Sequence, residues 1–515
     1  MASPLLIELE RIVGKEYVRR GEAERIAYSA DMWPRNQLWK LQGDPARHPP
    51  DAVVHPGTEA EIVALHAAAL KHSVPLIPYG AGSGVCGGTV PIRGGVVMDV
   101  RRLRRLIAVD DHDLLVTAEA GIIGMHLEEE LDARGYTLGH FPSSILCSTL
   151  GGWIAARSGG QYSSKYGKIE DMVVRVRVVM PGGEILETGC EDGVDLAPLL
   201  IGSEGTLGTI TSATLRIHPK PEAKAFRGYR FQSLDSGLRA VRALLQGGLQ
   251  PCLVRLYDPF DTVLHRSDKD HDLDVVAEAV SEGGRQGRQT PGRFAAAAKR
   301  LGTALALGNA SWVNRIGAAL GQSCLLVVGF EGPRSVVDAD MRAAQALLTG
   351  LGGADGGEGP GLRWFEHRYH VSFKQSGVYD AGAFVDTLEV AATWSRLAAV
   401  YRAVREAVSP HALIMAHFSH SYREGGSIYF TFAAHRRDPK ALERLYDRVL
   451  HDTFAAVLRE GGSVSHHHGV GLGKREQMAR EHGAGLRLLY GVKDAWDPQA
   501  FMNPGKVLPD RAVTK

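Results

Sequence analysis

Apolar residues recur along the first half of the chain at two spacings, and each spacing predicts its own kind of element. Apolar positions three and four apart predict amphipathic helices over residues 58–71 and 124–134. Short apolar runs at 74–77 and 95–100 predict buried strands. Residues 173–180, which a Pro-Gly-Gly turn follows, predict a hairpin. This order of elements favours an α+β arrangement over a regular parallel βαβ array.

The pattern changes near Pro219, because prolines interrupt the strand pattern that ends at Ile217. Beyond this boundary, helical patterns such as 238–245 and 335–351 separate four more strand patterns. Those strand patterns cover residues 228–231, 252–257, 324–329 and 427–432. Their spacing predicts a second domain, built as an antiparallel sheet with helices on one face.

Three further stretches have weaker patterns. Residues 5–20 mix apolar and charged positions at helical spacing, while tryptophans and prolines over 31–50 favour an irregular arm with no assigned chemistry. Asp386 and Glu389 precede an apolar stretch, which predicts the start of a helix with Arg396 as an anion-binding side chain. An ordinary helix start without a ligand is the alternative interpretation.

Composition and charge narrow the class of protein. With 515 residues, 44% of them apolar and 23% charged, the chain is typical of a soluble globular protein with at least two domains. The formal net charge of +1 provides no global field for nucleic acid. Five scattered cysteines without C-x-x-C spacing favour reduced thiols over disulfides or a zinc site. Because neither a signal segment nor a membrane-spanning apolar run is found, we expect a cytoplasmic protein.

The glycine-rich stretch 78–88 follows the apolar run at 74–77 and is the first candidate site. So many glycines expose backbone N–H groups, and a concave nest of amides attracts a pyrophosphate without a lysine. A glycine-rich surface turn is the alternative. The stretch lacks the Lys-Ser/Thr ending of a Walker loop, and Pro91 follows where a Rossmann helix would begin. An unusual phosphate loop is therefore expected.

Several motifs follow this loop in order: Gly-His-Phe-Pro-Ser-Ser at 139–144, Thr-Leu-Gly-Gly-Trp at 149–153, a glycine-bounded stretch at 160–167 and a Gly-Ser-Glu-Gly motif near 202–205. Together with the loop they resemble the PCMH-type flavin-binding domain of the vanillyl-alcohol oxidase superfamily. The resemblance implies FAD, held non-covalently because Ser83 stands where some relatives have a histidine that attaches the ring. The implied cofactor-binding residues are Pro78, Tyr79, Gly80, Ala81, Gly82, Ser83, Gly84, Pro142, Ser143, Ser144, Thr149, Gly151, Gly152, Ser158, Tyr162, Glu204, Gly205, Gly208 and Ile210.

Three constellations in the C-terminal half supply candidate chemistry. Consecutive histidines at 466–468 follow a short strand, and their imidazoles exchange protons near pH 7; an exposed polar loop is the alternative. They cannot all face one way on a regular element, so at most two are expected to reach one site. Strand alternation places Tyr429 and Thr431 on one face, although a core tyrosine is also compatible. Arg255 lies between apolar residues, which indicates either an anionic ligand or a buried ion pair.

Read together, Arg255, Arg396, Tyr429 and the motif Ser-Val-Ser-His-His-His-Gly-Val-Gly at 463–471 resemble the alkyldihydroxyacetonephosphate synthase family. The resemblance implies exchange of the acyl chain of acyl-dihydroxyacetone phosphate for a fatty alcohol, through an adduct at flavin N5 and without net redox change. It also implies roles. His140 and Tyr429 take the catalytic positions, His466, His467 and His468 line the active site, and Arg255 and Arg396 hold the phosphate end of the substrate.

Two stretches depart from that family. Residues 501–507 resemble the C-terminal motif of flavin-dependent D-lactate and glycolate dehydrogenases, and residues 415–420 resemble their metal-binding stretch. The continuation that supplies further metal ligands is replaced by residues 422–426, so no metal site is expected. The alternative function is therefore an FAD-dependent D-2-hydroxyacid dehydrogenase. A flavin-binding paralogue without turnover is a third class, and the many polar residues at the site argue against it.

These observations divide the chain into four parts. Residues 1–50 form a helical arm, and residues 51–219 form the FAD-binding domain. Residues 220–455 form a substrate-binding cap with a helical insert at 267–322. Residues 456–515 form a segment that completes the active site and the FAD-binding domain. The alanine- and leucine-rich stretch 294–319 carries basic residues and is expected to contact a membrane peripherally; an ordinary helical hairpin is the alternative. The expected partners are a lipid-type substrate and, from the family resemblance, a second copy in a homodimer.

Overall fold

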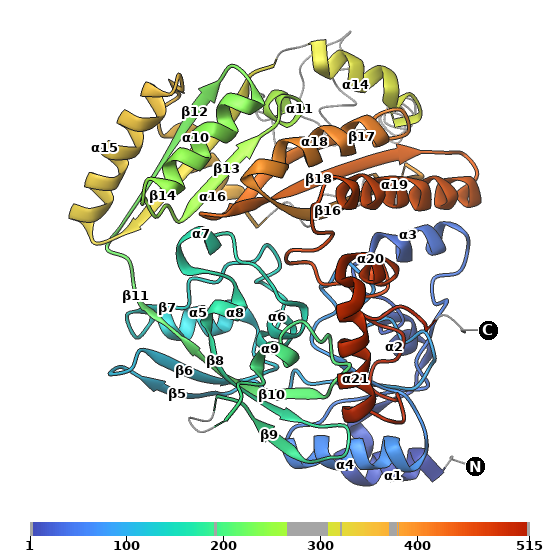
Figure 1. Ribbon diagram of the computed structural model, residues 1–515. Helices are drawn as coiled ribbons and strands as arrows, with labels where there is room; N and C mark the ends of the chain where they lie inside the picture. Colours follow the sequence, from blue (N-terminus) through green and yellow to red (C-terminus); the bar gives the residue numbers. More distant parts are fainter. Residues whose placement is uncertain are drawn as a thin grey trace, which may run out of the picture.

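The computed structural model describes residues 4–189, 193–264, 307–319, 322–369, 378–379 and 381–511. Figure 1 shows two bodies stacked on one another, an N-terminal domain below and a cap domain above, with both ends of the chain in the lower body. The chain crosses from one to the other at β11 (His218–Pro219), which pairs with β7 (Tyr136–Thr137). The expected boundary near Pro219 falls at this crossing.

The first fifty residues form short elements along the side of the N-terminal domain. These are α1 (Pro4–Val13), a 3-10 turn η1 (Lys15–Tyr17), β1 (Val18–Arg19), α2 (Glu22–Ala27) and α3 (Pro34–Leu41). The helix expected over 5–20 ends early because Gly14 adopts φ +89° and the chain then pairs with Val54 as a strand. The arm expected to be irregular contains α3, which begins with a proline in its first turn.

A small sheet in the order β1-β2-β4-β3 positions the glycine-rich stretch. Its strands β2 (Ala52–Val54), β4 (Val96–Asp99) and β3 (Leu76–Tyr79) are parallel, with β3 at one edge. Between β2 and β3 runs α4 (Glu59–Lys71), whose first turn is capped by the Thr58 hydroxyl, which accepts from the Glu61 amide. The expected helix and both expected strands are confirmed here to within a few residues.

A second sheet of the N-terminal domain is antiparallel and has the order β5-β6-β10-β8-β9. Its strands are β5 (Leu106–Asp110), β6 (Leu115–Glu119), β8 (Val173–Val179), β9 (Ile185–Glu187) and β10 (Thr209–Arg216). The helices that accompany it are α5 (Gly124–Asp132), α6 (Leu150–Ala156), α7 (Ser163–Tyr166), α8 (Ile169–Met172) and α9 (Ala197–Leu200). The expected hairpin is confirmed as β8 and β9.

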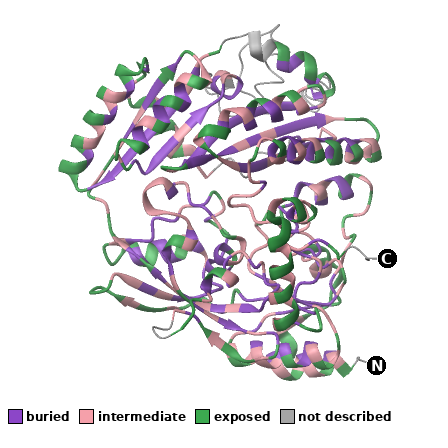
Figure 2. Ribbon diagram, in the orientation of Figure 1, coloured by how far each residue is buried: buried purple, intermediate pink, exposed green. Residues whose placement is uncertain are grey.

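The cap domain is a seven-stranded antiparallel sheet in the order β15-β12-β14-β13-β17-β18-β16. Its strands are β12 (Ala223–Phe231), β13 (Leu253–Tyr257), β14 (Cys324–Gly332), β15 (Ala354–Asp355), β16 (Ala383–Thr393), β17 (Leu413–Ser421) and β18 (Gly425–His435). Four helices cover one face, namely α10 (Leu234–Gln246), α15 (Arg334–Gly350), α18 (Trp394–Val408) and α19 (Pro439–Arg459). The other face is turned toward the N-terminal domain, and the central strands are mostly buried (Figure 2), with Arg255, Tyr429 and Thr431 partly exposed.

The stretch from Asp386 to Arg396 corrects the sequence prediction of a helix start. Residues up to Thr393 belong to β16, which pairs with β18 over its whole length, and helix α18 begins only at Trp394. The alternation of the strand sends Asp386 toward the Tyr446 hydroxyl under α19 and Glu389 to the opposite face. Asp386 and Glu389 therefore accept hydrogen bonds on opposite faces of the sheet, and neither lies at the N-terminus of a helix.

The last part of the chain returns to the N-terminal domain. Its elements are η3 (Arg475–Gln477), α20 (Met478–His482), η4 (Gly483–Gly485) and α21 (Leu486–Trp496). Phe501 and Met502 then enter the core of the small sheet, where Met502 forms a parallel bridge with Leu76 of β3. The end of the chain thus packs against the strand that leads into the glycine-rich stretch.

Most of the insert expected at 267–322 lies outside the described residues, and so do residues 294–306 of the stretch expected to contact a membrane. The described part of that stretch contains α14 (Ala310–Ala319), and the cap also contains α11 (Pro259–Leu264) and α16 (Gly359–His367). Leu307 and Val313 pack into a small apolar cluster with Phe260, while Trp312 is 52% exposed. None of the helices within the described ranges has the length and apolar character needed to cross a bilayer.

We predict that Phe430→Ala destabilises the protein by about 3–5 kcal/mol, because the fully buried ring fills the cap core beside Phe432 and Tyr401. Urea unfolding followed by circular dichroism measures the change. Ile107→Ala is the control, since that strand residue is 52% exposed and its loss is expected to cost under about 0.5 kcal/mol. Equal effects of the two substitutions would contradict this account of the core.

Candidate active site

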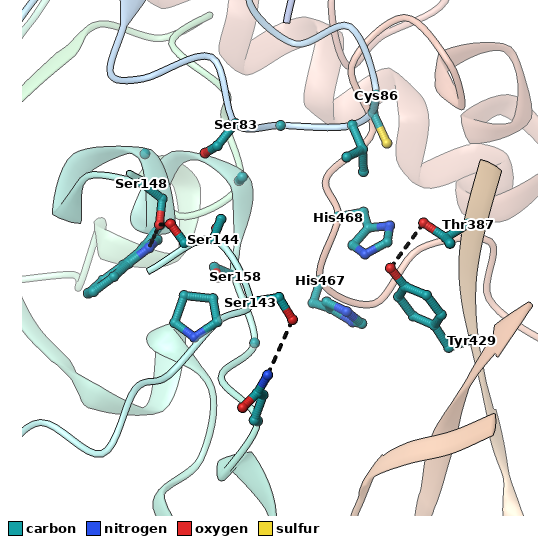
Figure 3. Close-up of a pocket in the computed structure, with 18 of the residues that line it drawn as sticks. Ser83, Cys86, Ser143, Ser144, Ser148, Ser158, Thr387, Tyr429, His467 and His468 are labelled. Atoms are coloured by element: carbon teal, nitrogen blue, oxygen red, sulfur yellow. Dashed lines mark hydrogen bonds between the residues drawn. The ribbon is translucent and has the colours of Figure 1, made fainter. Parts of the chain in front are cut away.

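A cavity of about 520 Å³ lies between the two domains. On one side it is lined by loops of the N-terminal domain, and on the other by the uncovered face of the cap sheet. Figure 3 shows this division, with Ser83, Ser143, Ser144 and Ser158 on one side and His467, His468, Tyr429 and Thr387 on the other. The site therefore exists only where both domains meet.

The glycine loop, residues 80–88, begins directly after β3 and forms part of the cavity wall. Gly80 packs so closely on α6 that a Cβ there would lie 2.3 Å from Thr149 Oγ1. That hydroxyl is not free to move away, because it caps α6 by accepting from the Gly152 amide at 3.2 Å. The bare backbone of the loop and the N-terminus of α6 thus lie side by side, an arrangement that favours an anionic group.

Nearly all of the predicted cofactor-binding residues line this cavity. They are Pro78 to Gly84, Pro142, Ser143, Ser144, Thr149, Gly151, Gly152, Ser158, Glu204, Gly205, Gly208 and Ile210. Tyr162 is the exception: it is buried behind the wall against Phe141, and its hydroxyl has no hydrogen-bond partner among the described residues.

The cap contributes side chains from four neighbouring strands, and strand register explains why they share a face. Tyr257 lies opposite His417, His417 opposite Tyr429, and Tyr429 opposite Glu389. Residues directly opposite one another in antiparallel strands project to the same side of the sheet. Other residues of that face that line the cavity are Arg255, Met415, Ser419, Thr431, Val385 and Thr387. The residues between them, such as Phe418 and Phe430, point into the cap core.

Tyr429 is the centre of an aromatic cluster on this face. Its ring is nearly parallel to that of His417, with centroids 4.8 Å apart, and meets the edge of His468 at 5.3 Å. Its hydroxyl donates to Thr387 Oγ1 at 3.0 Å, as drawn in Figure 3. Burial raises the pKa of Tyr429, so the phenol is protonated at neutral pH. The alternative of a core tyrosine is therefore wrong for this residue, because it lines the cavity.

The histidine run is held by one buried carboxylate. Glu389 accepts from the backbone N–H groups of His466, His467 and His468 at 2.7, 3.3 and 2.7 Å. The same carboxylate pairs with Lys474 at 2.8 Å, and both side chains are at most 1% exposed. Burial would raise the pKa of Glu389, but Lys474, His468 and His466 together outweigh it and hold the pKa below its ordinary value.

The histidines themselves are neutral. Burial lowers the pKa of His468 to about 4, and burial together with neighbouring histidines holds the pKa of His467 and His420 well below 6.5. His467 and His468 line the cavity, whereas His466 turns behind them and its Nδ1 lies 3.0 Å from that of His467. The expectation that at most two of the three reach one site agrees with this placement.

Two other predicted residues are not brought to the cavity. His140 is fully buried with its ring against Trp153, and its Nε2 lies 3.3 Å from the Ser158 hydroxyl; burial lowers its pKa to about 3. Arg396 is exposed on the outer side of α18, so the predicted pairing with Arg255 is wrong. The reason is the extension of β16 to Thr393, which moves Arg396 past the end of the sheet.

Several cavity residues escaped the sequence interpretation. Asp261 Oδ2 lies 3.4 Å from His417 Nδ1, and both line the cavity. His420 follows a register shift in β17 and has φ +49°, so a bulge turns it toward the cavity although alternation predicts the other face. From the other parts of the chain come Asp31, Arg363, His367 and Arg368. Alternation along β17 could have identified His417 and Ser419, but no local pattern marks the others.

The cavity has the features expected of an FAD site. Besides the glycine loop, six buried polar atoms of residues on its wall have no hydrogen-bond partner among the described residues: Asp31 Oδ2, Thr89 Oγ1, Gln161 Oε1, Arg255 Nε, Arg368 Nε and His468 Nδ1. Such orphaned groups are costly unless a ligand satisfies them. A long ligand with an anionic centre and many polar atoms fits both observations.

Comparison with known proteins agrees with this geometry. The profile described as "FAD linked oxidases, C-terminal domain" matches residues 220–507, and that described as "FAD binding domain" matches residues 50–189. The chain is 30% identical to alkyldihydroxyacetonephosphate synthase of Trypanosoma brucei brucei, over 98% of this chain and 81% of the relative. The chain belongs to the alkyldihydroxyacetonephosphate synthase family of FAD-linked oxidases.

Other relatives of this FAD-linked oxidase have similar names. The synthase of Dictyostelium discoideum is 31% identical over 90% of this chain and 74% of the relative. A solved alkyldihydroxyacetonephosphate synthase structure superimposes with a TM-score of 0.76 at 27% identity, covering 98% of this chain and 85% of that one. The predicted α+β fold, with an FAD-binding domain and a cap, and the predicted FAD cofactor are confirmed. Within the described residues, no three His, Cys, Asp or Glu side chains gather as metal ligands would.

We predict that Gly80→Ala weakens FAD binding. The added methyl group would force Thr149 to release the cap of α6, and overpacking of this kind costs about 1–3 kcal/mol. A rise of about tenfold or more in the Kd for FAD is expected from titration of the apoprotein. Gly491→Ala is the matched control, since its Cβ would meet no atom within 4 Å. Unchanged FAD affinity of Gly80→Ala would refute the close packing described here.

We also predict that Glu389→Gln destabilises this oxidase by about 3–5 kcal/mol, because it leaves the Lys474 ammonium buried without a counter-charge. Chemical unfolding of the holoprotein measures the loss. In the double variant Glu389→Gln/Lys474→Met, most of the stability is expected to return, since no uncompensated charge remains. If the double variant is no more stable than the single one, the ion pair is not the dominant interaction.

Proposed function

We propose that this protein is an FAD-dependent synthase that exchanges the acyl chain of acyl-dihydroxyacetone phosphate for a fatty alcohol. One observation carries the proposal: Tyr429, His467, His468 and Arg255 line a single cavity opposite the glycine loop. Arg255 and Tyr429 come from strands of the cap, and His467 and His468 from the histidine run. They belong to a chain about 30% identical to named alkyldihydroxyacetonephosphate synthases over most of its length.

The cationic side of the cavity suits the phosphate of such a substrate. Arg255 makes no ion pair with a described carboxylate, and its buried Nε has no partner. Arg363, His367 and Arg368 line the same cavity from α16 and the turn after it. Guanidinium groups without a counter-charge bind dianionic phosphate bidentately, so these arginines replace Arg396 in the proposed phosphate site.

The chemistry requires proton transfers at one carbon. The C–O bond to the departing carboxylate breaks, a C–O bond to the alcohol forms, and the proton lost by the alcohol balances the released acid. FAD, when bound, supplies an electron-poor ring that stabilises negative charge on the substrate carbon. Neutral His467 and His468 can accept a proton at a ring nitrogen, and Tyr429 Oη, protonated and aligned by Thr387, can donate one.

The cavity also limits access of water. The cap sheet covers the N-terminal loops, and the apolar lining residues Val385, Leu325, Val327 and Met415 leave room for hydrocarbon beside the polar wall. A lipid-type substrate is therefore compatible with the site. Trp312 and Arg315, both exposed on α14, support the proposal that this part of the cap contacts a membrane surface.

The test is an exchange assay with purified holoprotein, palmitoyl-dihydroxyacetone phosphate and labelled hexadecanol. We predict labelled alkyl-dihydroxyacetone phosphate from the wild type and a loss of about 10²-fold or more in kcat for Tyr429→Phe, because a positioned proton donor contributes at least this factor. Folding and flavin content of the variant are checked by its absorbance spectrum.

Arg255→Leu and Arg396→Leu form a matched pair in the same assay. Removing a charged hydrogen-bond donor from the phosphate site is expected to lower kcat/KM about 10- to 100-fold for Arg255→Leu, whereas Arg396→Leu is expected to stay near wild type. No product from folded, flavin-loaded protein would exclude the synthase. Anaerobic bleaching of the flavin by a 2-hydroxy acid would then favour the dehydrogenase, since the chain is also 24% identical to a Bacillus subtilis protein named glycolate oxidase subunit GlcD.

A further inference from the structure

The N-terminal strap, which we define as residues 28–42, lies outside both matched family profiles but contacts the glycine loop directly. The backbone N–H of Met32 donates to the carbonyl oxygens of Gly82 and Gly84, at 3.1 and 2.9 Å. Two carbonyls of the loop are thus directed away from the cavity by the strap. A loop whose carbonyls point outward has its amides available for an anion on the inner side.

Asp31 anchors the strap next to this contact. The side chain is 7% exposed and belongs to the cavity wall, and its Oδ1 accepts from the Trp33 amide at 3.0 Å and from Asn36 Nδ2 at 3.1 Å. Burial raises the pKa of Asp31 to about 6, while the backbone amides of Trp33 and Thr89 work against that shift. A Cβ at Gly84 would lie 4.0 Å from Asp31 Oδ2, so the carboxylate stands beside the middle of the glycine loop.

The strap also fills the space behind the loop. A Cβ at Gly87, which has φ +77°, would lie 2.7 Å from the Trp33 ring. The indole therefore packs on the bare backbone of the loop, and no other residue type at position 87 would leave room for it. Backbone, carboxylate and indole contacts together fix the near arm, the middle and the far arm of the glycine loop.

The other end of the strap is attached to the cap. Glu443 on α19 accepts from Trp39 Nε1 at 3.0 Å, from Gln42 Nε2 at 2.7 Å and from Arg35 Nη1 at 3.4 Å. Leu38 is fully buried in the core of the cap domain. Glu443 itself is not part of the cavity wall. A single segment of fifteen residues, counted from its bounds 28–42, thus joins a cap helix to the cofactor loop.

We propose that the N-terminal strap holds the glycine loop in its FAD-binding shape, with Asp31 as the positioning residue and Glu443 as the anchor that couples the cap to FAD affinity. Asp31 acts through the strap, because its carboxylate fixes the Trp33 amide and the Asn36 side chain, while the neighbouring Met32 amide binds the loop. The strap is preorganised by the cap, and a preorganised loop binds its ligand without the cost of ordering. FAD affinity is then partly determined by a cap helix that does not touch the cofactor cavity.

The experiment measures the Kd and dissociation rate of FAD with two variants of the full chain. Asp31→Asn replaces the charged acceptor of the Trp33 amide and of Asn36 Nδ2 by a weaker neutral one, and a rise of about tenfold or more in Kd is expected. Glu443→Leu releases three donors at the cap end, and a rise of about three- to tenfold is expected, with faster FAD dissociation. Asp452→Asn is the matched control on α19, because Asp452 pairs with Arg448 and not with the strap.

Thermal unfolding separates positioning from a general loss of stability. In Asp31→Asn the apoprotein is expected to melt at the same or a higher temperature, because burial disfavours the charged carboxylate, while the increase in Tm on adding FAD shrinks. FAD Kd values within twofold of wild type for both variants would overturn the proposal. So would an equal fall in the Tm of apo and holo Asp31→Asn at unchanged Kd.

Discussion

A buried carboxylate at the edge of the cap sheet determines where the proposed catalytic side chains stand. Glu389 belongs to β16, the last strand of the sheet, and Ser463 continues that edge by pairing with Ala391 before the chain turns into the histidine run. The three backbone N–H groups of the histidine run lie in a turn and do not donate to the backbone of any strand that the structure describes. The carboxylate satisfies all of them, and Lys474 provides the counter-charge that makes its burial affordable.

This interaction also explains the state of the imidazoles. Their backbones lie against an anion, yet their rings are buried among one another, and desolvation dominates, so that the pKa values fall well below neutrality. A neutral imidazole retains a nitrogen that can accept a proton. The same row of the sheet brings Tyr429 to them as a protonated phenol. Strand register, together with the hydrogen bonds from the histidine run to Glu389, thus gathers proton acceptors and a proton donor around one cavity. This arrangement is compatible with an exchange that begins and ends at the same redox level.

Patterns in the sequence predicted those features of the structure that depend on interactions between residues close together in the chain. The glycine loop, the helix after Thr58, the alternation at Tyr429 and the exposed position of most polar faces depend on neighbours only a few residues away. The failures all involve distant partners. Residues 386–393 have acids that suit a helix start, but pairing with β18 overrides that preference. His420 reaches the cavity because of a bulge in β17, which the resemblance of residues 415–420 to a metal-binding stretch does not indicate. Asp31 reaches it because the neighbouring Met32 amide binds the glycine loop, and no pattern in its own stretch marks it.

The position of the N-terminal strap shows how the two domains share one site. The FAD-binding loops could in principle fold without the cap, but here the glycine loop is held from outside at several points: by Met32 of the strap, by the amides of Leu472 and Gly473, which donate to the Cys86 carbonyl, and by Asn503, whose Nδ2 donates to the Gly88 carbonyl. All three segments lie outside residues 50–189, which match the FAD-binding domain. Coupling between two sites is reciprocal. The free energy by which the cap strengthens FAD binding is therefore also the free energy by which bound FAD stabilises the docking of the cap on the N-terminal domain. Binding of FAD at the glycine loop and docking of the cap over the cavity therefore stabilise each other, and the cofactor contributes to the interface between the two domains.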